Sequence, residues 1–310
     1  MKIRYILFLI AFGLLCPQGI LFAQSSDSSL LEDVNPIVPA KKMNISYEVN
    51  SANGYGFSSS TKQPNQNGQK LSVLNDSLDV TIAPKISNNF ILRTGVGWGR
   101  FSLFKDGSVP LPDTLQSVYM KIGFDTIIGN DWIVRVEAMP GVYSDFTDVT
   151  TDDISMEMIV GASYLMNENF QWMFGVGLGM FRQIPIFPAV GFRWQFEDNW
   201  NLNLMLPNPR LSYSLNKQVD LYLGGSLLGG TFRTGPNNGT QNNDASLNNA
   251  MLDYIEARTG VGVKYNVTPA ISIDADAGYT VFRQFDYYRS DMKVKADPAP
   301  YVSLSVTSQF

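Results

Sequence analysis

The chain has 310 residues, of which 45% are hydrophobic and only 16% charged, with one cysteine and no histidine. The charged fraction is below the roughly 25% of a typical soluble domain, yet a mean hydropathy of −0.05 argues against a bundle of transmembrane helices. The pI near 4.8 argues against a nucleic-acid partner, which requires a basic face. Without histidine, the chain lacks the commonest general base and metal ligand, so we expect no enzyme, no metal site and no cofactor.

The first 23 residues have the pattern of a secretory signal peptide. Lys2 and Arg4 supply positive charge ahead of an apolar run over residues 6–16. That run is too short to cross a bilayer as a helix. We predict cleavage between Ala23 and Gln24, and therefore export from the cytoplasm of a Gram-negative cell.

The segment after the signal peptide has a different character. Residues 24–42 are polar and are interrupted by Pro36 and Pro39, which predicts a disordered periplasmic N-terminal tether ahead of a single domain over residues 43–310. A lipoprotein signal that uses Cys16 is the alternative to cleavage at residue 23. Such signals need a small residue before the cysteine, and Leu15 is large.

From residue 43 to the end, apolar and polar residues alternate. In residues 132–138, one parity holds Trp, Val, Val and Ala, whereas the other carries Arg135 and Glu137. Residues 118–127 and 255–265 repeat the pattern, which is typical of strands with one face in an apolar medium. Each segment is about 10 to 14 residues long, enough for a tilted strand to cross a membrane.

The connections between these segments alternate in length. Short polar turns such as 129–131 and 167–169 are separated by longer polar stretches such as 105–115 and 234–249. Short turns on one side and long loops on the other are typical of outer-membrane barrels. Four short turns are followed by an aromatic residue, as in a periplasmic aromatic girdle: Phe90, Trp132, Phe170 and Trp200.

The C-terminal segment 301–310 is an amphipathic strand that ends in Phe310. It resembles the terminal signal that the barrel-assembly machinery reads. A soluble β-sandwich is the alternative, but it does not explain the signal peptide, the alternation and the loop lengths together. We therefore predict an all-β fold, a transmembrane up-and-down antiparallel β-barrel with short periplasmic turns and longer extracellular loops.

The alternation predicts about 14 strands. The short pair at 200–206 and 210–215, punctuated by Pro207 and Pro209, leaves 12 as the alternative. The expected strands are 43–57, 70–83, 90–103, 116–127, 132–144, 154–165, 170–182, 188–196, 200–206, 210–215, 219–232, 250–265, 271–284 and 299–310.

The chain resembles the uncharacterised outer-membrane β-barrel families of unknown function found in Bacteroidota-type bacteria. The resemblance rests on the residues around the cleavage site (22–24), the stretch 204–210, the Gly278-Tyr279 strand and Phe310. It implies an envelope location and carries over no functional residue.

Assigning apolar residues to lipid places the charged ones in the lumen. We expect cross-strand salt bridges, for example between Lys121 and Asp125 on one strand and Arg135 and Glu137 on the next. Another set would join Glu256 and Arg258 to Asp274 and Asp276. These charges either hold the interior together or form a constriction for a polar solute. The candidate residues are Arg93, Lys121, Asp125, Arg135, Glu137, Glu157, Arg193, Glu256, Arg258, Asp274 and Asp276.

Other residues carry weaker expectations. Arg182 and Arg283 fall on the lipid-facing parity, where they could reach lipopolysaccharide phosphates. Inward glycines in residues 175–179 leave room for an inserted segment. The acidic stretch 145–153 lacks the spacing of a calcium loop, so we interpret it as a solvated loop.

The sequence therefore predicts an integral outer-membrane barrel, most simply a passive channel or transporter, or a binder of a small polar solute. The alternative is a non-conducting structural or surface-interacting envelope protein with a plugged lumen. Expected partners are outer-membrane lipid, lipopolysaccharide and the assembly machinery, and no nucleic acid.

Overall fold

The computed structural model describes residues 43–55, 57–60, 70–105, 109–241 and 244–310, with the backbone alone for 48–55, 57–60 and 240–241. The predicted signal peptide (1–23), its cleavage site at Ala23 and Gln24, and the predicted tether (24–42) lie outside these residues. In the described part, no helix is long and apolar enough to span a bilayer.

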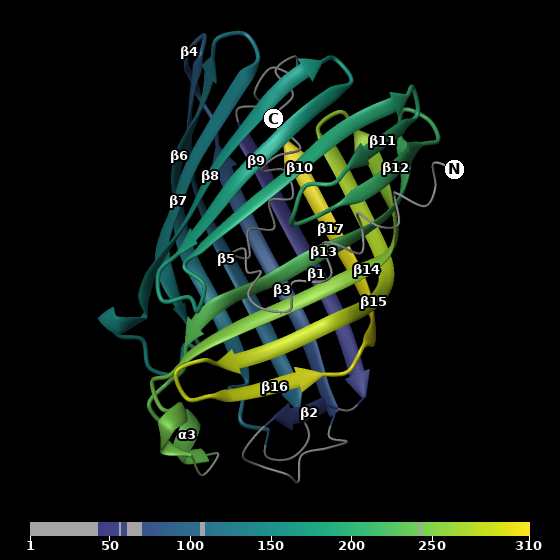
Figure 1. The fold of residues 1–310 in the computed structure, drawn as a ribbon. Coiled ribbons are helices and arrows are strands. Elements are labelled where there is room, and N and C mark those ends of the chain that lie inside the picture. The colour runs from purple at the N-terminus through teal and green to yellow at the C-terminus, as the bar shows by residue number, and fades with distance from the viewer. Residues whose placement is uncertain (1–42, 56, 61–69, 106–108, 242–243) are drawn as a thin grey trace.

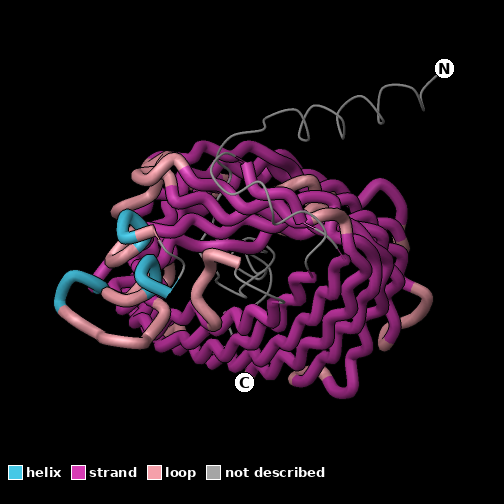
Figure 2. Tube along the Cα trace, turned by 90° about the horizontal axis from the view of Figure 1, so that it is seen from below, coloured by secondary structure: helices cyan, strands magenta, loops and turns pink. Residues whose placement is uncertain are grey.

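Fourteen antiparallel strands form a closed ring, as Figures 1 and 2 show. Each pairs with its neighbour in the chain, and the last pairs with the first. The ring strands are β1 (Met43–Tyr55), β3 (Lys70–Ile82), β5 (Phe90–Lys105), β6 (Thr114–Ile128), β7 (Trp132–Ser144), β8 (Ile154–Asn167), β9 (Phe170–Gly179), β10 (Ile186–Glu197), β11 (Trp200–Asn203), β12 (Arg210–Ser214), β13 (Val219–Arg233), β14 (Met251–Thr268), β15 (Ile271–Tyr287) and β17 (Ala299–Gln309).

The ring is closed by β1 and β17, which pair from Asn44 opposite Gln309 to Ala52 opposite Tyr301. At the end of this ladder, Met43 and Phe310 exchange two backbone hydrogen bonds of 3.0 and 2.8 Å. No strand of the ring is left with an unpaired edge at this seam, which is the condition for a sheet to lie in lipid.

The predicted fold class and the count of fourteen are confirmed. The doubtful pair is present as β11 and β12, which are only four and five residues long. The smaller elements lie between the ring strands: β2 (Phe57–Ser60), β4 (Lys85–Ser87), β16 (Met292–Ala296), α3 (Asn238–Gln241) and the 3-10 helices η1 (Thr151–Asp153) and η2 (Ala245–Leu247).

The two ends of the barrel differ. We call the end with the short turns the turn end and the other the loop end. At the loop end, the Asn-rich stretch 234–249 folds back on the barrel. Leu247 is fully buried, and Thr234 donates a 2.8 Å hydrogen bond to its carbonyl.

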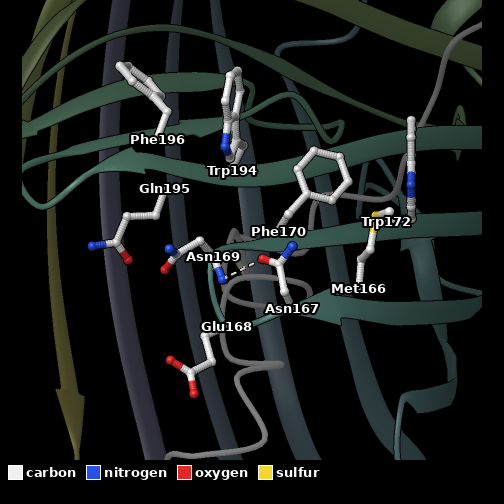
Figure 3. Close-up of a pocket in the computed structure, with 9 residues that line it drawn as sticks. All are labelled: Met166, Asn167, Glu168, Asn169, Phe170, Trp172, Trp194, Gln195 and Phe196. Carbon is white, nitrogen blue, oxygen red and sulfur yellow. Dashed lines mark hydrogen bonds between the residues drawn. The ribbon is translucent and has the colours of Figure 1, made fainter.

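Aromatic side chains form a belt at the turn end. Phe90 stacks on Phe124 at 5.4 Å, Trp132 lies 5.0 Å from Tyr164, and Phe196 stacks on Trp200 at 6.1 Å between ring centroids. Between the β8–β9 and β10–β11 turns, the belt borders a shallow recess (Figure 3), with the rings of Trp194 and Phe196 on one side and the Glu168 carboxylate on the other. Rings at this level are typical of a membrane–water interface.

The hydrogen-bonded wall has one break. Because β11 and β12 are short, they pair only with residues 193–197 of β10 and 220–224 of β13. Closer to the loop end, residues 186–191 of β10 and 228–232 of β13 face each other. Within the described chain, they have no strand partner on these facing edges. We call this stretch the wall break.

At the loop end, β13 contacts β7 directly, on the far side of the break. Arg233, the last residue of β13, pairs in parallel with Ser144 of β7, and Asp145 donates a 3.0 Å backbone hydrogen bond to Arg233. β13, β14 and β15 run more obliquely than β5 to β8 (Figure 1), which brings β13 to β7. We call β8, β9 and β10, which this contact bypasses, the flap.

Phe310→Ala should lower the amount of barrel in the outer membrane of expressing cells several-fold, because the aromatic terminus is the proposed assembly signal. The Met43–Phe310 contacts are backbone hydrogen bonds, so the same variant refolded from urea into detergent should give the wild-type circular dichroism spectrum. Equal yields of both proteins in membranes would contradict the proposed role of Phe310.

Candidate functional site

The interior of the barrel holds the charged residues, and the largest group lies on β3, β5, β6 and β7. Its members alternate with outward apolar residues, as the strand period of two requires. All six are buried. We call it the polar cluster: Asp79, Arg93, Lys121, Asp125, Arg135 and Glu137.

The polar cluster is joined by ion pairs between its strands. Lys121 Nζ lies 2.7 Å from Asp79 Oδ2, Arg135 Nε lies 2.6 Å from Asp125 Oδ1, and Arg93 Nε lies 3.2 Å from Glu137 Oε2. Arg135 also donates through Nη2 to Asp125 Oδ2 at 2.9 Å, so this pair is bidentate. Three cations and three carboxylates neutralise one another, as buried charges must.

Two of the partners differ from the predicted ones. The expected cross-strand pair of Asp125 with Arg135 is present, but Lys121 pairs with Asp79 on β3 and Glu137 pairs with Arg93 on β5. Long side chains lean along the lumen wall and reach one strand further than the direct cross-strand neighbour, which alternation alone does not reveal.

A second buried cluster lies on β14 and β15. Glu256 accepts hydrogen bonds from Tyr254 and Arg258, and from Arg283 Nε at 2.6 Å. Tyr254, Glu256 and Arg283 are almost completely buried. One carboxylate thus lies between two guanidinium groups.

The prediction that Arg283 faces lipid is wrong, and a β-bulge is the reason. The register between β14 and β15 shifts where Ala257 pairs with Phe282 and Arg258 pairs with Thr280, which leaves Val281 as an extra residue. An extra residue reverses the parity of the strand beyond it. Arg283 therefore faces the interior.

The acids of β15 have partners on other strands. Asp276 pairs with Gly262, four residues beyond Arg258 on β14, a separation of about 13 Å along a strand. Asp274 Oδ1 instead lies 3.5 Å from Arg210 Nη1, and Asp276 accepts a 3.5 Å hydrogen bond from Tyr222.

The remaining predicted residues lie on the flap. Arg193 is half-buried on the inward parity of β10. Glu157 of β8 is buried and pairs with Arg182, so the prediction that Arg182 faces lipid is also wrong. Arg182 belongs to the loop after β9, and that loop folds back far enough to place the guanidinium against β8.

The loop end of the interior is closed by apolar side chains. Phe101 of β5 meets Phe232 of β13 at 6.0 Å and Tyr254 of β14 at 4.7 Å between ring centroids, both edge to face. Val109 and Leu111, from the loop between β5 and β6, are buried in the same cluster. We call this cluster the aromatic closure, and it joins opposite sides of the barrel.

The wall break is covered by an inserted segment. Residues 204–209 hydrogen-bond to both edges, from Leu204 N to Phe192 O at 2.9 Å and from Leu227 N to Pro207 O at 2.9 Å. Met205 is buried against Met173 and Ala189. A Cβ at residue 191 would lie 2.7 Å from Met205 Cα, so Gly191 makes room for the inserted segment.

The acidic stretch 145–153 satisfies its charges internally. Asp145 is buried and accepts a 2.6 Å hydrogen bond from Gly235 N and a 3.0 Å bond from Thr147 N. Asp153 caps η1, and Asp152 lies 3.5 Å from Arg233. These contacts hold both ends of the 145–153 loop in place, while residues 147–152 between them are exposed, as a solvated loop requires.

Lys121→Met should lower the free energy of unfolding by about 3–5 kcal/mol, the usual cost of a buried charge that loses its partner. The double variant Asp79→Leu/Lys121→Met should recover most of that loss, because no charge is then left alone. Urea unfolding in detergent, followed by tryptophan fluorescence, measures both. Lys85→Met, at an exposed position, is the control, and additive losses in the double variant would contradict the pairing.

Phe101→Ala should cost about 3–5 kcal/mol, because it leaves a cavity between β5, β13 and β14. Phe104→Ala, three residues along the same strand but 60% exposed on the outer face, should cost less because it leaves no cavity. The same urea titration compares the two. Equal losses would show that the aromatic closure is not packed.

The comparisons with known proteins agree with this architecture. The fold is similar to that of an outer membrane channel from Pseudomonas putida F1, with a TM-score of 0.50, 8% identity, and coverage of 88% of this chain and 97% of that chain. It is also similar to the P. putida toluene transporter TodX, with a TM-score of 0.45, 8% identity, and coverage of 89% and 91%. No curated protein matches the sequence. Residues 32–309 match the family described as Domain of unknown function (DUF6268), and the chain belongs to that family.

Proposed function

We propose that the chain is an integral outer-membrane barrel that carries a small solute across that membrane. The support is the closed ring of strands with apolar outer faces, the aromatic belt, and a fold like that of an outer-membrane channel. In this orientation, the turn end faces the periplasm and the loop end faces the cell exterior. Outer-membrane lipid, lipopolysaccharide and the assembly machinery are its proposed partners, and export uses a signal peptide cleaved after Ala23.

The solute is proposed to have a largely apolar body, and the aromatic closure is the observation that carries this. Phe101, Phe232 and Tyr254 meet in a buried apolar cluster that fills the interior towards the loop end. A solute that enters there must replace ring-to-ring contacts, which apolar surface does at the least cost.

The polar solute predicted from the sequence stays a prediction. A polar solute requires lumen charges that face it. In the structure, the charges of the polar cluster are buried and paired: Lys121 with Asp79, Glu137 with Arg93, and Arg135 with Asp125. These pairs fit the role of fixing the shape of the interior. We propose a transport protein and not an enzyme, because the fold is similar to that of an outer-membrane channel.

Expression of the protein in a Gram-negative host should raise the uptake of N-phenyl-1-naphthylamine, an apolar probe that an intact outer membrane excludes. Uptake of a neutral disaccharide should change little, and the purified barrel in planar bilayers should show at most brief openings. Phe101→Ala should raise probe uptake further, because it loosens the aromatic closure.

The opposite pattern identifies the competing functions. Steady conductance with disaccharide uptake would overturn the apolar solute and restore the polar one. No current and no uptake of either compound, from a barrel shown to be folded in the membrane, would overturn transport and favour a structural or surface role.

A further inference from the structure

The flap ends in a loop that grips the outside of the neighbouring wall. The loop comprises residues 180–185, between β9 and β10. Gln183 donates its backbone N–H to Asp253 Oδ2 at 3.2 Å, and Tyr288 donates its hydroxyl to the carbonyl of Phe181. Asp253 belongs to β14 and Tyr288 follows β15, so the loop reaches across the wall break to strands that it does not adjoin in the sheet.

The contact lies on the outer face of β14, because Asp253 alternates with the inward residues Tyr254 and Leu252 of the aromatic closure. Asp253 is nevertheless buried, and it accepts a further 2.6 Å hydrogen bond from Thr231 of β13. The 180–185 loop supplies the cover that buries it.

A buried ion pair holds the loop in this shape. Arg182 turns back from the loop to pair with Glu157 of β8. Its side chain crosses β9 at Gly179, where an added Cβ would lie 2.3 Å from Arg182 Cδ. A side chain at residue 179 would therefore prevent the pair from forming.

The backbone of the loop is strained. Phe181 has a φ of 61°, in the left-handed region, and a bulky residue persists there only where its surroundings enforce it. Burial raises the pKa of the Tyr288 phenol, so the hydroxyl stays protonated and continues to donate at neutral pH.

The covering of the wall break thus differs from the rest of the barrel. Apart from the ladders of the short strands β11 and β12, neighbouring ring strands are joined by nine or more paired residues, as between β1 and β17. Across the break, the 180–185 loop makes two hydrogen bonds, and residues 204–209 make three backbone hydrogen bonds to the two edges. The loop itself is held in shape by the ion pair of Arg182 and by backbone hydrogen bonds such as that from Met180 N to Met156 O at 3.0 Å. Segments with few contacts of this kind open at a lower free energy than the ladders around them.

We propose that the 180–185 loop is a latch that keeps the wall break shut, and that its release opens a passage between the barrel interior and the surrounding lipid beside Met205. Release frees Phe181 from its strained conformation and lets the flap swing away from β13 and β14. That a solute uses this passage rests on the proposed function. The structural evidence for the latch does not depend on it.

The test uses a single thiol on the inner face of the break. Ala189→Cys, with Cys16→Ser, places the only thiol at a buried position that contacts Met205. The full-length protein, reconstituted in lipid vesicles, is treated with N-ethylmaleimide, which partitions into lipid, or with a membrane-impermeant maleimide of similar size. The rate of labelling by each reagent is measured.

Two latch variants are compared in this background. Tyr288→Phe removes one hydroxyl, and Arg182→Met/Glu157→Gln removes the ion pair without leaving a lone charge. Since one hydrogen bond to a charged group can change an opening equilibrium roughly tenfold, we expect about tenfold faster labelling by N-ethylmaleimide in the double variant and a smaller rise in Tyr288→Phe. The rate of labelling by the impermeant reagent should rise much less, because the passage opens to lipid.

Tyr265→Phe, an exposed tyrosine nearer the turn end of β14, is the matched control and should label at the starting rate. Unchanged labelling in both latch variants, with the barrel still folded by its heat-modifiable migration on gels, would overturn the latch. An equal gain with both reagents would overturn the passage to lipid. Faster labelling without any uptake of N-phenyl-1-naphthylamine would keep the latch and overturn the proposed transport.

Discussion

The pairing of every backbone donor and acceptor is the constraint on which the structure depends. A sheet surrounded by lipid cannot leave an edge unpaired, so the first and last ring strands must meet. The register of β1 with β17, together with the Met43–Phe310 contacts, satisfies this at the seam. Where β11 and β12 are too short to continue the ladder, residues 204–209 supply hydrogen bonds to both edges. These bonds extend the backbone pairing of β10 and β13 as far as Phe192 and Leu227, the residues next to the wall break.

Closure also decides what the interior contains. Strands that present apolar residues to lipid present their other parity inward, and in this chain that parity carries charge and glycine. The charges are compatible with burial because they neutralise one another, as Lys121 does with Asp79 and Arg283 does with Glu256. Towards the loop end, the inward residues become aromatic, and Phe101 reaches Tyr254 across the barrel. The interior thus changes along its axis from a polar framework to an apolar seal.

The period of two was sufficient to predict the fold, the fourteen strands and their order, because lipid on one face imposes that period on every strand. Partners inside the lumen were less predictable. Arg283 was assigned to the wrong face because the bulge at Val281 adds one residue that leaves no mark in the alternation. Arg182 was misplaced because a strand expected to reach residue 182 ends at Gly179. Met205 and Phe101 read as ordinary apolar residues, and only the three-dimensional path of the chain reveals what they fill.

The contact between Arg233 of β13 and Ser144 of β7 gives the molecule two perimeters. Around its middle, the wall runs through all the ring strands. At the loop end it runs from β13 directly to β7, and β16 pairs with β2 on the opposite side. The flap is outside this narrower circuit. Its loops can therefore vary in length and sequence without changing the volume that the narrow circuit encloses, whereas residues 145–153 and 234–250, which join that circuit, must vary together.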